Sequence, residues 1–235
     1  GNVTSLDLRF PRVFAPTPED PLIRSLKSAF ANDYAGIESP KFVYQHVVAP
    51  HTPFTIDRHG EYTTAYGVFA TTAEGDSVVQ NDPERRRLYV SGYLEKLLYV
   101  NGQTLDQVRR LLASPRQKII IIHGDHGSGS RYHTNDASKT CLRERFTSFI
   151  AVYADVPHVR DNLEWISGPD ATPVNLYRSI FSSLFRVPLR LLPRHSYFVN
   201  FKTPHQLETL DPNLIARNCD EDGIAPPDSL VAETP

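Results

Sequence analysis

The chain has 235 residues and a mass of 26.5 kDa, and hydrophobic residues make up 40% of it. This is enough apolar material for a core that needs no disulfide or metal, so a single domain is the default expectation. Its 25 Lys and Arg residues nearly balance 27 Asp and Glu residues, for a formal net charge of -2. The balance argues against binding to nucleic acid or an anionic membrane through net charge, and the apolar runs fall far short of the roughly 20 residues that span a bilayer.

The first part of the chain predicts one helix, one strand and a long loop. Residues 1–37 are expected to be an entry segment, in which residues 22–30 carry apolar side chains at helical spacing. Residues 41–48 are rich in β-branched and aromatic side chains, lie between two X-Pro breakers, and predict a buried strand. Residues 52–82 are polar with neither helical nor strand periodicity, which predicts a long loop containing at most a short hairpin. Long loops of this kind are more often functional than structural.

The central part predicts an α/β pattern. Asp82 followed by Pro83 predicts the start of a long helix that ends near residue 114, and residues 118–123 form an apolar run that predicts a second strand. A strand, a helix and a strand in this order are typical of a crossover between parallel strands. Residues 146–153 predict a third strand, and residues 173–185 a helix capped by Thr172. The predicted fold class is therefore α/β, with a loosely ordered tail over residues 201–235.

Side chains suited to chemistry follow directly after the predicted strands, where parallel sheets bind their ligands. Asp125 and His126 follow the second strand in a glycine-flanked turn, and a carboxylate beside an imidazole suits zinc or manganese. His51 follows the first strand in a loop stiffened by prolines on both sides, and His133 lies eight residues after Asp125. Together these residues predict a metal-assisted centre for a phosphate or sulfate ester.

Each of these features also has a structural interpretation. Asp and Gly favour turns, so an Asp-His-Gly triplet is common without any function, and a single histidine can simply bond a loop carbonyl. Lys139, Arg143 and Arg145 are candidate anion ligands, but they could equally form surface ion pairs of little energetic value. Cys141 and Cys219 could be free thiols or one disulfide.

Several ordered segments resemble the C-terminal half of a sulfatase-type catalytic domain of the alkaline phosphatase superfamily, of the type attached to bacterial membrane proteins. The segments are Ala49–Phe54, Tyr93–Asn101, Gly124–Gly127, Cys141–Phe146, Thr172–Arg178 and Leu191–Phe198. The resemblance covers residues 38–200. It implies a three-layer αβα sandwich around a mainly parallel sheet, of which this chain would form only a part.

The resemblance also implies roles for single residues. Asp125 and His126 correspond to a metal-ligand pair, and His51 to a histidine that faces the transferred group of the substrate. His133 keeps the spacing of a second substrate-side histidine, although its neighbours depart from the family's glycine-containing pattern. The implied cofactor is a divalent metal, with Zn, Mn, Mg and Ca all open. Nothing in the first 40 residues resembles the family's nucleophile-bearing half, and Cys141 lacks the context of a nucleophile.

Two functions follow from these expectations. The first is the C-terminal half of a metal-dependent hydrolase or transferase that acts on a small-molecule or lipid-linked sulfate or phosphate ester. Its partner would be the missing N-terminal half of the same protein, which carries the nucleophile, and it would bind no nucleic acid. It would act outside the cytoplasm, anchored to a bacterial membrane by a segment absent from this chain. The alternative is a catalytically inactive sulfatase-like module for binding or assembly at the cell surface, and an unrelated α/β domain is a third possibility.

Overall fold

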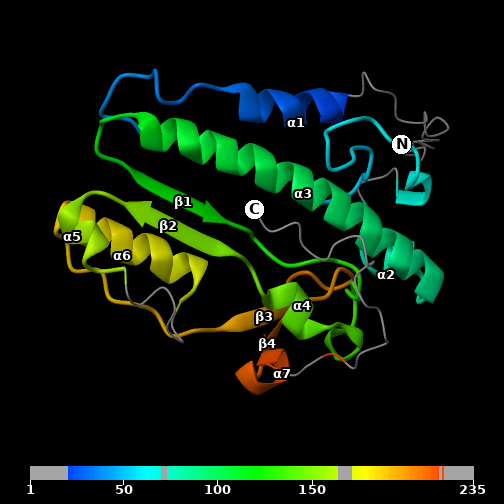
Figure 1. Ribbon diagram of the computed structural model, residues 1–235. Helices are drawn as coiled ribbons and strands as arrows, with labels where there is room; N and C mark the ends of the chain where they lie inside the picture. Colours follow the sequence, from blue (N-terminus) through cyan, green and yellow to red (C-terminus); the bar gives the residue numbers. More distant parts are fainter. Residues whose placement is uncertain (1–20, 70–72, 164–170, 217–218, 220–235) are drawn as a thin grey trace, which may run out of the picture.

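The computed structural model describes residues 21–69, 73–163, 171–216 and 219, which form helices and short strands (Figure 1). The α-helices are α1 (Pro21–Ala31), α2 (Asp76–Val79), α3 (Pro83–Ala113), α4 (Leu142–Phe146), α5 (Pro157–Arg160), α6 (Pro173–Phe185) and α7 (Pro212–Ala216). The strands are β1 (Ile119–His123), β2 (Ile150–Ala154), β3 (Ser196–Val199) and β4 (Leu207–Leu210). Short 3₁₀ helices span Gly67–Phe69 and Ala137–Lys139.

The helix predictions are confirmed, together with the caps that predicted them. The Asp82 side chain accepts hydrogen bonds from the backbone N–H groups of Glu84 and Arg85, and it satisfies two of the donors left open at the start of α3. The Thr172 hydroxyl accepts from the N–H of Asn175 at 3.1 Å in the same way. Local capping chemistry therefore sets where these helices begin.

The predicted parallel sheet is wrong for the part of the chain that the structure covers. β1 pairs antiparallel with β2, with Ile119 opposite Ala154 and His123 opposite Ile150, and β3 pairs antiparallel with β4. A parallel pair needs a crossover that carries the chain back to the starting edge. After β1 the chain instead runs through a loop and α4 and turns back beside the strand it has just left. Two small antiparallel sheets thus replace the expected large sandwich.

The prediction of a buried strand at residues 41–48 is also wrong. The structure assigns no strand there, and the side chains of Phe42 and Tyr44 are 78% and 70% exposed. Strand-forming side chains favour a pleated surface only where a neighbouring strand and a packed face exist. The loop prediction for residues 52–82 is confirmed in part: an antiparallel bridge between Ile56 and Tyr62 closes a short hairpin, but the 3₁₀ helix Gly67–Phe69 and α2 also lie in this range.

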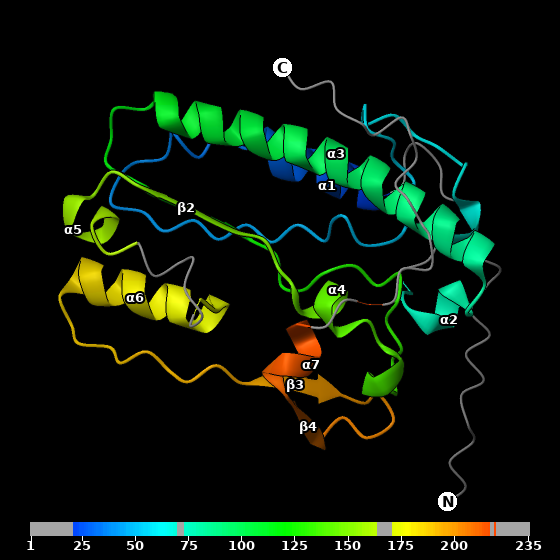
Figure 2. The ribbon, with the colours of Figure 1, turned by 60° about the horizontal axis from the view of Figure 1, so that its bottom comes forward.

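Helices flank the β1–β2 ribbon on two sides. α1 and α3 lie on one side and α5 and α6 on the other, in both views (Figures 1 and 2). Leu176 and Ile180 of α6 are buried in one cluster with Ala154 and Val159, and half-buried residues of β1 and β2 pack against it. A separate cluster joins α1 to Tyr99 of α3. The core is thus divided among small clusters.

Two elements, β4 and α7, lie within residues 201–235, which the sequence predicts to be a loosely ordered tail. β4 and α7 are ordered, and Leu210 and Ile215 are buried together with Tyr132, Leu142 and Phe198. A disulfide joins Cys141, the N-cap of α4, to Cys219. Within the described residues, no helix combines the length and the apolarity needed to cross a membrane.

Candidate functional site

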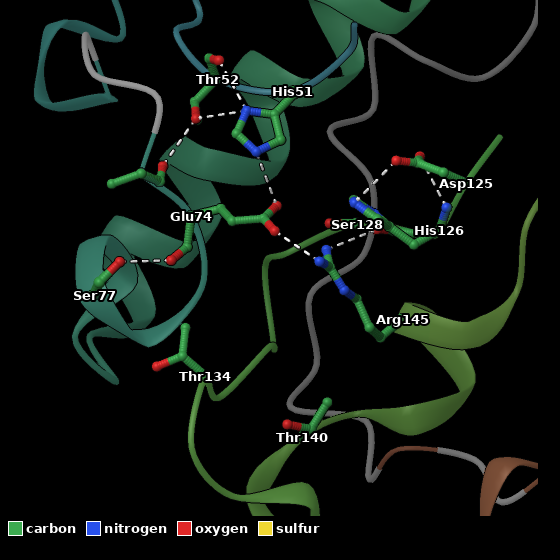
Figure 3. Close-up of polar contacts among 12 residues, drawn as sticks. His51, Thr52, Glu74, Ser77, Asp125, His126, Ser128, Thr134, Thr140 and Arg145 are labelled. Atoms are coloured by element: carbon green, nitrogen blue, oxygen red, sulfur yellow. Dashed lines mark hydrogen bonds and ion pairs between the residues drawn. The ribbon is translucent and has the colours of Figure 1, made fainter. Parts of the chain in front are cut away.

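The predicted site residues lie on loops around the start of α2 and the end of β1. His51 comes from the loop before Phe54, Asp125 and His126 follow β1, and Arg145 projects from α4 (Figure 3). Glu74, two residues before α2, lies among them. Arg145 connects the two sides, because it donates to the carboxylate of Glu74 at 2.7 Å and to the carbonyl of Gly127 at 3.4 Å.

Asp125 and His126 lie side by side in the turn that follows β1. The Nδ1 atom of His126 lies 2.9 Å from the carbonyl oxygen of Gly127, which can only accept, so Nδ1 carries the ring proton and the neutral ring has its lone pair at Nε2. That Nε2 atom lies 3.5 Å from Oδ2 of Asp125. Two ligands at about 2.1 Å from an ion, at a tetrahedral angle, are separated by about 3.4 Å. The pair therefore has the spacing of two ligands of one metal ion.

The loop that carries this pair is fixed to α4. The N–H of Gly127 donates to the carbonyl of Arg145 at 2.8 Å, and a Cβ at residue 127 would lie 1.8 Å from the carbonyl oxygen of Glu144. Only glycine permits this approach. Asp125 itself is 74% exposed. No group of three or more His, Cys, Asp or Glu side chains in the described ranges is arranged to hold a metal.

His51 has the same ring arrangement as His126. Its Nδ1 atom lies 2.9 Å from the carbonyl oxygen of Thr52, so the ring proton is again on Nδ1. The Thr52 hydroxyl lies 3.2 Å from the same nitrogen but donates its own proton to the carbonyl of Ala73 at 2.8 Å. The Nε2 atom therefore has the lone pair of the neutral ring, and it lies 3.4 Å from Oε2 of Glu74.

Glu74 lies between the imidazole of His51 and the guanidinium of Arg145, and it accepts a hydrogen bond from the guanidinium. The side chains of Glu74 and Arg145 are only 16% and 14% exposed, and the guanidinium also stacks 4.2 Å above the ring of Tyr132. Burial is the main cause of a raised pKa at Tyr89, and the charge of Glu74 adds to it. Glu74 thus occupies the guanidinium group that an anionic ligand would need.

His133 is held differently. Its Nδ1 atom accepts from the N–H of Asn135 at 3.4 Å, so the ring proton is on Nε2, which lies 3.3 Å from Oδ2 of Asp76. Burial alone would raise the pKa of Asp76, but hydrogen bonds from the backbone and hydroxyl of Thr134 and the nearby His133 outweigh it and lower that pKa. Both ring nitrogens of His133 therefore have partners within the chain.

The remaining candidates are the basic residues proposed as anion ligands and the two cysteines. Of the three basic residues proposed as anion ligands, Arg145 lies in the site, whereas Lys139 forms an exposed ion pair with Asp136 at 3.2 Å. The structure joins Cys141 to Cys219, one of the two alternatives left open by the sequence. No sequence motif singles out Glu74 or Asp76, whose one available signal is their position in the long polar loop.

Comparison with family models, with curated proteins and with solved structures found no match for this chain. The site must therefore be interpreted from its own geometry.

Proposed function

We propose that this chain supplies the metal-ligand pair and the substrate-facing groups of a metal-dependent hydrolase or transferase for phosphate or sulfate esters, with the nucleophile on a part of the protein outside this chain. The observation that carries the proposal is the Asp125–His126 pair, whose 3.5 Å separation and free Nε2 lone pair suit a divalent ion. Zn, Mn, Mg and Ca all remain candidates, although the imidazole ligand favours Zn and the carboxylate beside it also suits Mn. When bound, such an ion would draw negative charge away from the transferred group.

His51 and Arg145 supply the groups that an ester needs on the protein side. The Nε2 atom of His51 can take up a proton and return it to a leaving oxygen, because its other nitrogen is held by a carbonyl. The guanidinium of Arg145 offers the planar donors that match a phosphate or sulfate. His133 stays a prediction as a second substrate-side residue.

Neither Thr52 nor Cys141 is arranged as a nucleophile in this site. The Thr52 hydroxyl donates its proton to a carbonyl rather than to a base, and Cys141 is tied up in the disulfide. This supports the proposal that the nucleophile comes from an N-terminal half of the same protein. The disulfide also supports a location outside the cytoplasm, the compartment expected for the proposed bacterial, membrane-anchored enzyme.

One observation favours the alternative, a catalytically inactive binding or assembly module. Glu74 neutralises Arg145 and faces His51, so an anionic ester must displace or share that carboxylate before it can bind. In an inactive module this arrangement would be permanent, whereas in an enzyme Glu74 would leave Arg145 when substrate arrives.

Thermal unfolding in the presence of Zn²⁺ or Mn²⁺ tests the metal pair. We expect the melting temperature of the wild-type chain to rise with metal concentration, and the rise to vanish in Asp125→Ala and in His126→Ala. His158→Ala removes a histidine from α5 and serves as the matched control, which should keep the full rise. An equal rise in all four proteins would contradict a metal role for this pair.

The full-length protein separates the two functions. Metal-dependent hydrolysis of p-nitrophenyl phosphate or p-nitrophenyl sulfate, lost in His51→Ala, would support the enzyme. Metal binding without turnover of either ester or of a transfer acceptor would support the inactive module.

A further inference from the structure

The long helix α3 carries a buried lysine that the proposed mechanism does not use. The side chain of Lys96 is 5% exposed, and its ammonium group donates to the carbonyl oxygens of His51 at 2.6 Å and Pro53 at 3.3 Å. Burial is the cause that lowers the pKa of Lys96 to about 8, and no carboxylate contributes to that shift. The ammonium group is therefore still charged at neutral pH, and its hydrogen-bond partners are backbone carbonyls. Because burying a charge costs free energy, we expect these two hydrogen bonds to have a structural role.

The loop around His51 is docked on the same face of α3. Phe54 is 1% exposed, and a Cβ at position 92 of the helix would lie 2.6 Å from its ring, so Gly92 makes room for it. The N–H of Phe54 also donates to the carbonyl of Phe69 at 3.2 Å. Downstream of His51, the loop is thus packed and hydrogen-bonded, and the Thr52 hydroxyl anchors it to the carbonyl of Ala73. Lys96 bonds the backbone carbonyl of His51 itself.

The carbonyl groups of this loop are divided between two donors. Lys96 engages those of His51 and Pro53, and the carbonyl between them, from Thr52, accepts from Nδ1 of His51. We propose that Lys96 is a positioning residue for His51: its two hydrogen bonds orient the loop so that the Thr52 carbonyl meets Nδ1. The opposite nitrogen, Nε2, is then directed at Glu74 with its lone pair available.

The importance of this arrangement for activity rests on the proposed function, in which Nε2 of His51 faces the substrate. The orientation of His51 by Lys96 does not depend on the proposed function, because the protonation site of the ring can be measured in the chain without any substrate. The two proposals can therefore fail separately.

Nuclear magnetic resonance of ¹⁵N-labelled histidine tests the proposal, with the His51 signals assigned by their loss in His51→Gln. In the wild-type chain we expect the neutral ring of His51 to be in the Nδ1–H form. In Lys96→Met, which keeps the buried volume and removes the donors, we expect that form to give way to a mixture dominated by Nε2–H. An unchanged Nδ1–H form in a folded Lys96→Met protein would overturn the proposal.

A second lysine gives the matched control. Lys118 is also largely buried, with 16% of its side chain exposed, and donates to the carbonyl of Ser114 at 2.6 Å, away from His51. Lys118→Met should leave the ring of His51 unchanged, whereas an equal change would mean that any buried-lysine loss loosens the loop and would overturn a specific role. If Lys96→Met does not fold, Lys96→Leu, which also removes every side-chain donor at this position, is subject to the same two outcomes.

Discussion

The molecule contains two histidine–carboxylate pairs that look alike and behave differently. In one, Nε2 of His51 lies 3.4 Å from Glu74, and in the other, Nε2 of His133 lies 3.3 Å from Asp76. Both histidine side chains are 23% exposed, and both carboxylates come from one turn at the start of α2. Distance and burial therefore do not distinguish the two pairs.

The difference lies in the other ring nitrogen. A carbonyl oxygen at Nδ1 of His51 keeps the proton there and leaves a lone pair at Nε2, whereas a backbone N–H at Nδ1 of His133 forces the proton onto Nε2. His133 thus donates to Asp76 through Nε2, whereas Nε2 of His51 carries no proton for Glu74 in the Nδ1–H form of the ring. The first pair suits proton transfer or ligand exchange, and the second suits structural support.

The largest effect is expected at Lys96, which bonds the backbone carbonyl of His51 in the first pair. Burial lowers the pKa of Lys96 from its ordinary value of 10.5 to about 8 in the folded chain. Between pH 8 and pH 10.5 the unfolded chain therefore binds more protons than the folded chain. The contribution of this group to folding stability rises with pH over that range. Urea denaturation at each pH gives the free energy of unfolding of the wild type and of Lys96→Met. We expect the wild-type value minus the Lys96→Met value to increase by about 3 kcal/mol from pH 8 to pH 10.5. A difference that stays flat across this range would contradict the burial of a charged lysine.

The second pair should matter more for stability than the first. Asp76→Asn weakens hydrogen bonds to Thr134 and the contact with His133, so we expect a loss of about 2 kcal/mol in the free energy of unfolding at pH 7. Since the folded pKa of Asp76 is lowered, its contribution is present above the ordinary pKa of about 3.9 and disappears as the pH falls through the folded value. The gap between wild type and Asp76→Asn should therefore close in acid, and a gap that is constant with pH would weaken this account.

The first pair should instead control anion binding. Glu74→Gln keeps the shape of the side chain but removes the charge that competes for Arg145, so we expect the affinity for inorganic phosphate to rise about tenfold, equivalent to about 1.4 kcal/mol. Isothermal titration calorimetry measures this directly, with Asp76→Asn as the control that should bind phosphate like the wild type. Equal gains in both variants would show only a general effect of reduced negative charge.

The smallest effect is expected at the ion pair that the structure places outside the site. Lys139→Ala removes an exposed contact with Asp136, and such contacts contribute little because solvent screens them. Neither the midpoint of urea unfolding nor the phosphate affinity should change measurably. A loss of phosphate affinity would return Lys139 to the list of anion ligands.

What the sequence could predict depended on the range of the interactions. The start of α3 follows from Asp82 and Pro83 alone, because capping is a local property. The strand at residues 41–48 required a partner that no local pattern can supply, and the direction of β2 depended on where the chain returned after α4.

The same limit applies to the site. Asp125, His126 and His51 were candidates because they follow apolar runs or lie between prolines, and the structure brings them to one region with Arg145. Glu74 and Lys96 were missed, because each acts on a residue more than 20 positions away and neither belongs to a motif. Only the folded chain reveals those contacts.

The most direct test of the central claim is a crystal structure of the chain soaked with Zn²⁺ or Mn²⁺, with the ion located by its anomalous scattering. The account predicts an ion about 2.0–2.2 Å from both an oxygen of Asp125 and Nε2 of His126, with Nδ1 of His126 still bonded to the Gly127 carbonyl. An ion bound elsewhere, with Asp125 and His126 left in their present positions, would contradict it.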